Sequence, residues 1–445
     1  MKKKTAWIAG IIVAVTLIVV LVWNFNAKKD PFDEHLEDVA ADTYEFFKTY
    51  TNKETGLTAD RVDMGESINA TPHTSPTNIA MYLMSTVAAV EMDLIPFDEG
   101  EERVAATLQT LEQMEKWNGL FYNWYFIDDG ALMVDWGQFI STVDNGWLTA
   151  GLVVAGQYFP ELADQTGPLV EAMDYSTLYD DNAHLFYGGY DVATESLTNH
   201  HYGTLYSETR ITSYLAIGKG DVPEVHWWHL LRTNPPKDTW QSQIPEGDYV
   251  TIDGVQVYQG HYEYEGIEYV PSWGGSMFEA LMPGLVIDEL ALGENALGLN
   301  NARHVAGQIK YAEMNDLDAW GFSPASLPNG YSEFGAPVLG ISGYEDHSTV
   351  TPHAAFMALD YDREAVEANL AVLRDLDMYG EYGYYDSVNL ISGERAEAYL
   401  SLDQGMIMLA IANHLHDSII REQFHNDPIG STPERLLSEE EFFIQ

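Results

Sequence analysis

The fold is decided by a stretch that is apolar on almost every face of a helix, Leu402-Asp403-Gln404-Gly405-Met406-Ile407-Met408-Leu409-Ala410-Ile411-Ala412. Leu402, Met406 and Leu409 recur at helical spacing, and isoleucines fill the remaining faces. A helix that is apolar all round is buried. The stretch therefore predicts a helix enclosed by other helices.

Other segments carry apolar residues on one face only, as helices on the outside of a fold do. Ser75 and Pro76 are typical of a helix start, and regularly spaced apolar residues follow them. Asp98 and Glu101 form a capping-box pattern before a second such run. Residues 360–375 show similar spacing. The chain thus combines buried helices with amphipathic ones.

Short aromatic phrases that contain glycine recur between the helical runs. They have no fixed period, so a solenoid is not indicated. They lie at 119–124, 185–190, 320–323 and 382–386. Helical hairpins whose loops bring these aromatics to one mouth fit the pattern. We therefore expect an all-α fold, an (α/α) toroid with an inner and an outer ring of helices.

Residues 238–271 depart from the helical pattern. Tyr249, Val255 and Val257 belong to runs of β-forming residues, and Asp253-Gly254 is a typical hairpin turn. We expect a small β insertion at the rim of the toroid.

The N-terminus predicts a membrane segment. Three lysines at 2–4 precede an uncharged run, residues 6–23, which is just long enough to span a bilayer. No small-residue cleavage site follows, so we favour an uncleaved anchor over a removed signal peptide, with the bulk of the chain exported. The expected organisation is an anchor at 1–26, a linker at 27–34, a catalytic domain at 35–425 and an acidic tail at 426–445.

The charge balance narrows the choice of partners. The chain has 69 acidic against 21 basic residues, a formal charge of −48. Such a field repels nucleic acids and anionic lipid surfaces, and it favours a neutral glycan over an anionic one. Acid spread along the whole chain is also typical of proteins from salt-loving organisms, because salt screens the repulsion. There is no cysteine, so disulfides and thiolate chemistry are excluded.

Aromatic residues make up 12% of the chain, with 27 Tyr and 11 Trp. Flat aromatic faces stack on the C–H faces of sugar rings, so the excess favours a glycan cleft. An aromatic-rich core explains the excess equally well.

Two carboxyl groups stand in settings suited to cleavage of a glycosidic bond, which usually needs such a pair. Glu208 precedes a buried helical run, so either Arg210 neutralises its charge or Glu208 faces a cleft. Glu279 lies among apolar residues, which would raise its pKa and suit a general acid. A buried glutamate with a purely structural role is the alternative.

Further polar residues are candidates for the same site. Asp144 stands before an apolar helix, where it either caps the helix or faces the cleft. Lys219, Asp221 and His226 cluster beside two tryptophans. They either bind sugar hydroxyls or form a structural ion-pair network.

The histidines give no metal-binding pattern, because none stands in H-E-x-x-H or another ligand spacing. Nor does the chain contain a P-loop or a G-x-S-x-G nucleophile elbow. We therefore expect neither a metal nor a cofactor.

Several of these phrases together resemble the glycoamylase-like domain. The most specific are Ser-Glu-x-Arg at 207–210 running on to Gly-Lys-Gly-Asp-Val-Pro at 218–223, and Ser-Trp-Gly-Gly-Ser-Met-Phe-Glu at 272–279. This domain also occurs within cyclic β-1,2-glucan synthases, and it is related in fold to bacterial endo-β-1,2-glucanases. The likeness extends over about residues 35–420. It implies an (α/α)6 toroid that hydrolyses β-glucan or transfers glycosyl units.

The resemblance also implies roles for individual residues. Glu208 and Glu279 look like the catalytic carboxylates, with Asp144 in the cleft beside them. The residues expected to bind substrate are Arg210, Lys219, Asp221, His226, Trp147, Trp273, Tyr385, Asp386 and Gln404.

The sequence therefore predicts a membrane-anchored, extracellular glycoside hydrolase that acts on a neutral β-glucan, with β-1,2-glucan favoured. The alternatives are a β-glucan transglycosylase using the same cleft and a non-catalytic glycan-binding protein of the cell envelope. The oligomeric state leaves no signal in the sequence.

Overall fold

The computed structural model describes residues 29–65, 67–344 and 348–442. The chain divides into two compact units, Met1–Asp38 and Val39–Gln445. The expected anchor at 1–26 lies outside the described residues. The expected linker at 27–34 is too long, because helix α2 (Pro31–Tyr50) already starts at Pro31. Proline suits the first helical position, and Asp33 and Glu34 follow in the first turn, where the helix dipole favours acid.

Helices dominate the described residues. After α2 they are α3 (Pro76–Glu91), α4 (Phe97–Gln113), α5 (Thr142–Tyr158), α6 (Ala163–Ala172), α7 (Arg210–Lys219), α8 (Val225–His229), α9 (Met277–Leu281), α10 (Glu289–Leu292), α11 (Leu297–Met314), α12 (Pro352–Phe356), α13 (Arg363–Asp375), α14 (Ser401–Leu415), α15 (Ile419–Asn426), α16 (Pro428–Ser431) and α17 (Glu434–Glu439).

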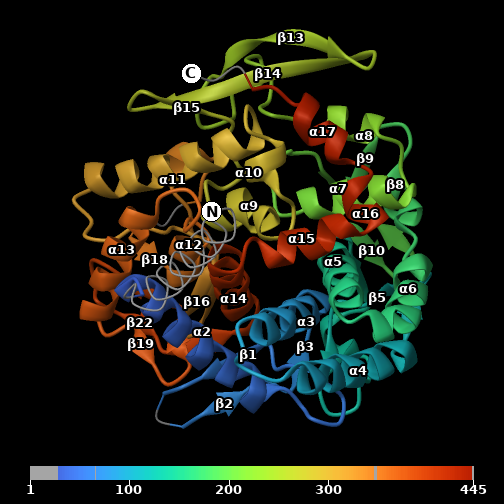
Figure 1. Cartoon of the computed structure of the whole chain (residues 1–445). Helices are drawn as coiled ribbons and strands as arrows, with labels where there is room; N and C mark the ends of the chain where they lie inside the picture. The colour runs from blue at the N-terminus through green and yellow to red at the C-terminus, as the bar shows by residue number, and fades with distance from the viewer. Residues whose placement is uncertain (1–28, 66, 345–347, 443–445) are drawn as a thin grey trace, which may run out of the picture. The chain divides into compact units, whose positions relative to one another are not determined.

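The second unit arranges these helices in two layers (Figure 1). Helices α3, α5, α7 and α14 are buried along almost their whole length. Helices α4, α6, α11 and α13 lie outside them and bury one face each. The apolar stretch at 402–412 belongs to α14, so its prediction as an enclosed helix is confirmed.

The helix starts follow local chemistry, with one exception. Ser75 caps α3 and Pro76 is its first residue, as expected. Helix α4, in contrast, begins at Phe97 after Pro96 and has no side-chain cap. The capping box expected at Asp98 and Glu101 is therefore wrong.

Short strands occupy the loops, so the expectation of an all-α chain is too narrow. The strands are β1 (Arg61–Asp63), β2 (Asn69–Ala70), β3 (His73–Thr74), β4 (Lys116–Trp117), β5 (Leu120–Phe121), β6 (Tyr125–Phe126), β7 (Phe139–Ser141), β8 (Tyr179–Asp180), β9 (Leu185–Tyr187), β10 (Gly189–Asp191), β11 (Ser196–Leu197), β12 (His201–Tyr202), β13 (Glu246–Ile252), β14 (Val255–Tyr264), β15 (Ile267–Tyr269), β16 (Ala325–Leu327), β17 (Gly330–Ser332), β18 (Thr349–Val350), β19 (Tyr379–Gly380), β20 (Gly383–Tyr384), β21 (Ser387–Asn389), β22 (Arg395–Ala396) and β23 (Ala398–Leu400).

The expected β insertion is present. Strands β13, β14 and β15 form an antiparallel three-stranded sheet. Ile252 pairs with Val255 across the predicted turn, whose two residues, Asp253 and Gly254, both have positive φ. Such values are typical of a tight hairpin turn.

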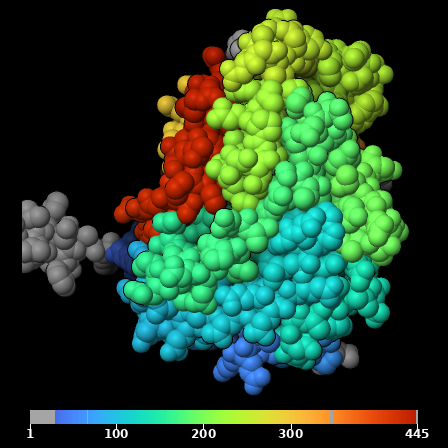
Figure 2. Space-filling model, turned by 90° about the vertical axis from the view of Figure 1, so that its right-hand side faces the viewer, coloured from blue at the N-terminus to red at the C-terminus, as the bar shows by residue number. Residues whose placement is uncertain are grey.

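The C-terminal residues are part of the fold and not a tail, which corrects the boundary expected at 426. Leu436 and Leu437 are fully buried, and Glu440 forms a buried ion pair with Arg232. Gln259 of β14 donates a hydrogen bond to the same carboxylate over 3.4 Å. Figure 2 shows the C-terminal segment, in red, beside the segment that forms β13–β15. Acidic composition alone did not reveal the burial of Glu440.

No helix among the described ranges is long and apolar enough to cross a bilayer.

Candidate active site

Two neighbouring cavities share Glu208 in their walls. The first has a volume of about 460 Å³ and is also lined by Asp144, Trp147 and Phe278. The second has a volume of about 500 Å³, and Glu279 lines it together with Glu208. The two carboxyl groups expected to do the chemistry therefore face one space.

Glu208 lies in the loop that leads into α7. Its Oε2 accepts a hydrogen bond from the hydroxyl of Ser207 over 3.1 Å. The pKa of Glu208 is raised to about 7, mainly by burial and next by the nearby carboxylate of Glu279, with a smaller contribution from Asp144. A carboxyl group in this state still holds its proton near neutral pH.

Arg210 holds this loop in place but does not line either cavity. Its guanidinium is fully buried and pairs with Glu289 over 2.6 Å. It also donates to the carbonyl oxygens of Leu205 and Ser207 over 3.1 and 3.3 Å. The expectation that Arg210 neutralises Glu208 or binds substrate is therefore corrected. Arg210 positions the backbone on which Glu208 is carried.

Glu279 is the third residue of α9, in a capping box with Ser276. Its carboxylate accepts hydrogen bonds from the backbone N–H of Gly274 at 2.9 Å and of Ser276 at 3.3 Å. The hydroxyl of Tyr344 donates to Oε1 over 3.0 Å. Burial raises the pKa of Glu279, and these hydrogen bonds oppose the shift.

The turn before α9 explains why glycines precede Glu279. Gly275 has φ +80°, and a Cβ there would lie 1.9 Å from the carbonyl oxygen of Ala336. Only glycine fits this position. A Cβ on Gly274 would lie 2.0 Å from the ring of Tyr344. The Gly-Gly pair thus lets the backbone and the tyrosine close around the carboxylate.

Asp144 is the third residue of α5 and faces the first cavity. Ser141 caps the helix, so the reading of Asp144 as the cap itself is wrong. Thr77 donates a hydrogen bond to Oδ1 over 2.6 Å. The amide of Asn123, in the orientation that satisfies both of its polar atoms, donates to Oδ2 over 3.0 Å. Burial raises the pKa of Asp144.

Aromatic side chains line both cavities. Trp147 and Trp124 line the first, and the Nε1 of Trp147 has no hydrogen-bond partner among the described residues. Trp273 lines the second and is 41% exposed, with its ring 5.8 Å from that of the exposed Trp240. Such faces can stack on sugar rings.

Three other residues expected to bind substrate lie away from these cavities. Lys219 and Asp221 form an ion pair of 2.8 Å at a separate cavity of about 400 Å³. His226 is fully buried, and its ring nitrogens contact the carbonyl oxygen of His184 and the hydroxyl of Ser213. Burial lowers the pKa of His226 to about 4. The structural ion-pair alternative therefore describes Lys219 and Asp221, whereas His226 is a buried histidine outside any ion pair among the described residues.

Tyr385, Asp386 and Gln404, which the family resemblance assigned to substrate binding, do not line either cavity. The carboxylate of Asp386 accepts a 2.5 Å hydrogen bond from the backbone N–H of Ser326, which does line it. Gln404 is buried and donates to the carbonyl oxygen of Tyr384. The ring of Tyr385 packs on Tyr399 at 5.2 Å.

Sequence reasoning missed Tyr344, Thr77 and Asn123, which contact the catalytic candidates. Tyr344 lies 65 residues from Glu279 and carries no local signal of this contact. Sequence reasoning also missed that His353, Asp386 and Asp403 lie close enough together to hold a metal ion.

The fold is shared with solved carbohydrate-active enzymes. The structure of an endo-beta-1,2-glucanase from Chitinophaga pinensis, with sophorotriose and glucose, matches with a TM-score of 0.73. The match covers 91% of this chain and 98% of that one at 18% sequence identity. At such identity the match shows the helix-rich fold of (α/α)6 enzymes.

Two curated relatives are similar in sequence. The cyclic beta-(1,2)-glucan synthase NdvB of Rhizobium meliloti is 32% identical over 294 residues, which cover 62% of this chain. The exo beta-1,2-glucooligosaccharide sophorohydrolase (non-reducing end) of Parabacteroides distasonis is 22% identical over 375 residues, 75% of this chain. The matches span 9% and 48% of these relatives' own lengths.

The helix-rich fold and the two carboxyl groups that face one cavity are features of the kind that glycoside hydrolases use. The chain belongs to the glycoamylase-like family, whose model, described as "Putative glucoamylase", matches residues 200–428, just over half of the chain. A second model, a protein of unknown function (DUF3131), matches residues 38–213.

Proposed function

We propose that this protein is a glycoside hydrolase that cleaves β-1,2-glucan, with Glu208 as the acid and Glu279 as its charged partner. The observation that carries the proposal is that both carboxyl groups line one cavity yet have unequal hydrogen-bond donors.

The donors decide which carboxyl group is charged. Burial raises the pKa of both, and each charge disfavours the other, so the pair retains one proton near neutral pH. Glu279 accepts from two backbone N–H groups and the Tyr344 hydroxyl, whereas Glu208 accepts from its own backbone N–H and the Ser207 hydroxyl. Because donors favour the charged form, the negative charge belongs to Glu279 and the proton to Glu208.

This arrangement performs both halves of glycoside cleavage. Glu208 gives its proton to the glycosidic oxygen as the bond to the anomeric carbon breaks. Glu279 attacks the anomeric carbon in a retaining enzyme or activates a water in an inverting one. The anomer of the first product, followed by NMR, distinguishes the two courses.

The substrate class rests on three lines of support. The two curated relatives and the solved relative carry β-1,2-glucan or its oligosaccharides in their names. The tryptophans at both cavities suit stacking on neutral sugar rings. The formal charge of −48 disfavours an anionic polysaccharide.

The test is incubation of the protein with β-1,2-, β-1,3-, β-1,4- and β-1,6-glucans, followed by sizing of the products and assay of new reducing ends. We expect cleavage of β-1,2-glucan. Glu208→Gln and Glu279→Gln should each abolish turnover and keep the folded circular dichroism spectrum. The matched control is Glu246→Gln, on the exposed strand β13, which should retain full rate. Full activity in either cavity variant refutes the assignment.

Product sizing also separates the alternatives. Longer or cyclic glucans without new reducing ends would identify a transglycosylase, the function that the match to a cyclic glucan synthase favours. Binding of glucan without any change in its length would identify a non-catalytic receptor.

We also propose that the chain is anchored in the membrane by residues 6–23 and exported. The support is the uncharged run after three lysines. Removal of residues 1–28 should move the protein from the membrane fraction to the soluble fraction of its host. An unchanged distribution would refute the anchor.

A further inference from the structure

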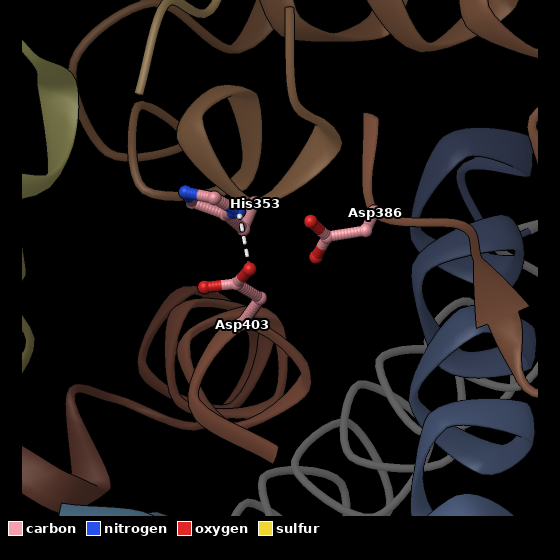
Figure 3. A group of neighbouring side chains, drawn as sticks. All are labelled: His353, Asp386 and Asp403. Atoms are coloured by element: carbon pink, nitrogen blue, oxygen red, sulfur yellow. Dashed lines mark ion pairs between the residues drawn. The ribbon is translucent and has the colours of Figure 1, made fainter. Parts of the chain in front are cut away.

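A second cluster of titratable side chains lies apart from the catalytic pair. His353 on α12, Asp386 between β20 and β21, and Asp403 in the first turn of α14 each offer one ligand atom, and these atoms lie within 4.8 Å of one another. Figure 3 shows the three side chains pointing toward a common space. At most 3% of each residue is exposed. Three distant segments thus meet at one buried polar point.

Apart from one another, the facing atoms lack hydrogen-bond partners among the described residues. They are Nδ1 of His353, Oδ1 of Asp386 and Oδ2 of Asp403. The other atoms of two of these side chains are engaged: Oδ2 of Asp386 accepts from Ser326 N–H, and Nε2 of His353 contacts the Ser323 hydroxyl over 3.0 Å. Buried polar atoms normally have partners, so three orphans aimed at one space indicate a bound group.

The charges around the cluster favour a cation. Two carboxyl groups and one imidazole are brought together here in a buried setting. The positive charge of Arg61 also attracts Asp386, but the Arg61 guanidinium forms its ion pair with Asp63, over 2.6 Å. No lysine or arginine among the described residues forms an ion pair with Asp386 or Asp403.

The distance between two of the facing atoms and the types of ligand narrow the choice of ion. Nδ1 of His353 and Oδ2 of Asp403 are 3.5 Å apart. Two ligand atoms roughly 2.1 Å from one zinc ion, at a tetrahedral angle, lie roughly 3.4 Å apart. One imidazole with two carboxylates suits Zn²⁺, whereas Ca²⁺ takes six to eight oxygen ligands and Mg²⁺ an octahedral set. The Nε2 contact with Ser323 is the kind of outer partner that orients a ligand histidine.

We propose that His353, Asp386 and Asp403 bind a Zn²⁺ ion, with a water molecule as the fourth ligand. The ion neutralises two buried carboxylates and ties α12, the loop before β21 and the start of α14 together beside the first cavity. The site is distinct from Glu208 and Glu279, and it stands or falls independently of the proposed catalysis.

The test is calorimetric titration of Zn²⁺ into the full-length protein after treatment with EDTA. We expect one ion per chain and a thermal midpoint that rises on zinc addition. Asp403→Asn and His353→Gln should weaken binding by at least the roughly 10–100-fold that loss of an outer partner causes. The matched control is His261→Gln, which removes a histidine that lies 3.8 Å from one carboxylate, that of Glu268. That variant should bind Zn²⁺ as the wild type does.

A measurement on the wild-type protein alone also tests the proposed Zn²⁺ site, in case the variants fold poorly. Co²⁺ at the site should give the intense visible absorption of a four-coordinate ion, lost on addition of Zn²⁺. Absence of stoichiometric binding would show that the two carboxylates share a proton instead and would overturn the proposal. Unchanged binding in Asp403→Asn and His353→Gln would also overturn it.

Discussion

The hydroxyl of Tyr344 offers the sharpest test of the roles proposed for the two glutamates. This hydroxyl donates a hydrogen bond to Glu279 over 3.0 Å. Among the described residues, no other side chain outside the 272–279 turn donates to Glu279. Tyr344→Phe removes this donor and keeps the ring that packs against Gly274. The variant thus changes the electrostatics of Glu279 with little change in shape.

The size of the effect follows from the bond that is lost. A hydrogen bond to a charged group contributes about 1.5–3 kcal/mol, and one pKa unit corresponds to about 1.4 kcal/mol. Loss of the Tyr344 donor should therefore raise the pKa of Glu279 by roughly one to two units. Glu279 must be charged and Glu208 protonated for turnover, so activity rises through the first pKa and falls through the second. The acidic limb should move toward neutral pH.

The assay is the pH dependence of kcat/KM on β-1,2-glucan, which reports the pKa values of the free enzyme. The control is Tyr202→Phe, which removes a hydroxyl from the same cavity that is not bonded to Glu279. That variant should leave the acidic limb in place, whatever its effect on KM. If a folded Tyr344→Phe enzyme keeps the wild-type acidic limb, Glu279 is not the charged partner.

Three further outcomes are expected. The pKa of Glu208 is raised from 4.5 to about 7 in the folded protein, so the stability that it contributes is complete below pH 4.5 and is lost as the pH rises through 7. The free energy of unfolding of Glu208→Gln, relative to that of the wild type, should therefore rise by about 2–3 kcal/mol between pH 4.5 and pH 8, as measured by urea unfolding. An equal difference at both pH values would contradict the raised pKa. Arg210→Met leaves Glu289 buried without its partner and should destabilise the fold by about 3–5 kcal/mol. Arg435→Met removes only exposed ion pairs, with Glu224, Asp253 and Glu439, and should leave the urea midpoint nearly unchanged. The thermal midpoint of the wild type should rise from 0.1 to 2 M KCl, because salt screens the charge of −48; a maximum in dilute buffer would remove the argument for a salt-loving source.

The parts of the site that the sequence predicts are those set by local pattern. Glu279 could be found because Ser276 and the two glycines of its capping turn are adjacent to it in sequence. The buried helix α14 could be found because its apolar faces are contiguous.

The parts that the sequence does not predict depend on distant partners. Arg210 was matched with Glu208, its neighbour, but its partner Glu289 lies 79 residues away. Glu440 was assigned to a tail, yet Arg232, 208 residues earlier, holds it in the core. Composition gives the number of charges, and only the fold decides which of them are paired.

The two buried carboxyl pairs show why this distinction matters for function. At Glu208 and Glu279 the donors are unequal, so one proton has a preferred site and can leave it when a sugar oxygen needs it. At Asp386 and Asp403 one oxygen of each carboxyl group and the facing imidazole nitrogen have no partner among the described residues apart from one another. A permanent cation suits the second arrangement but would abolish the first, because it would hold both glutamates charged and leave no acid. The proposed acid catalysis therefore fits the pair with unequal donors, and the proposed ion fits the pair beside the histidine.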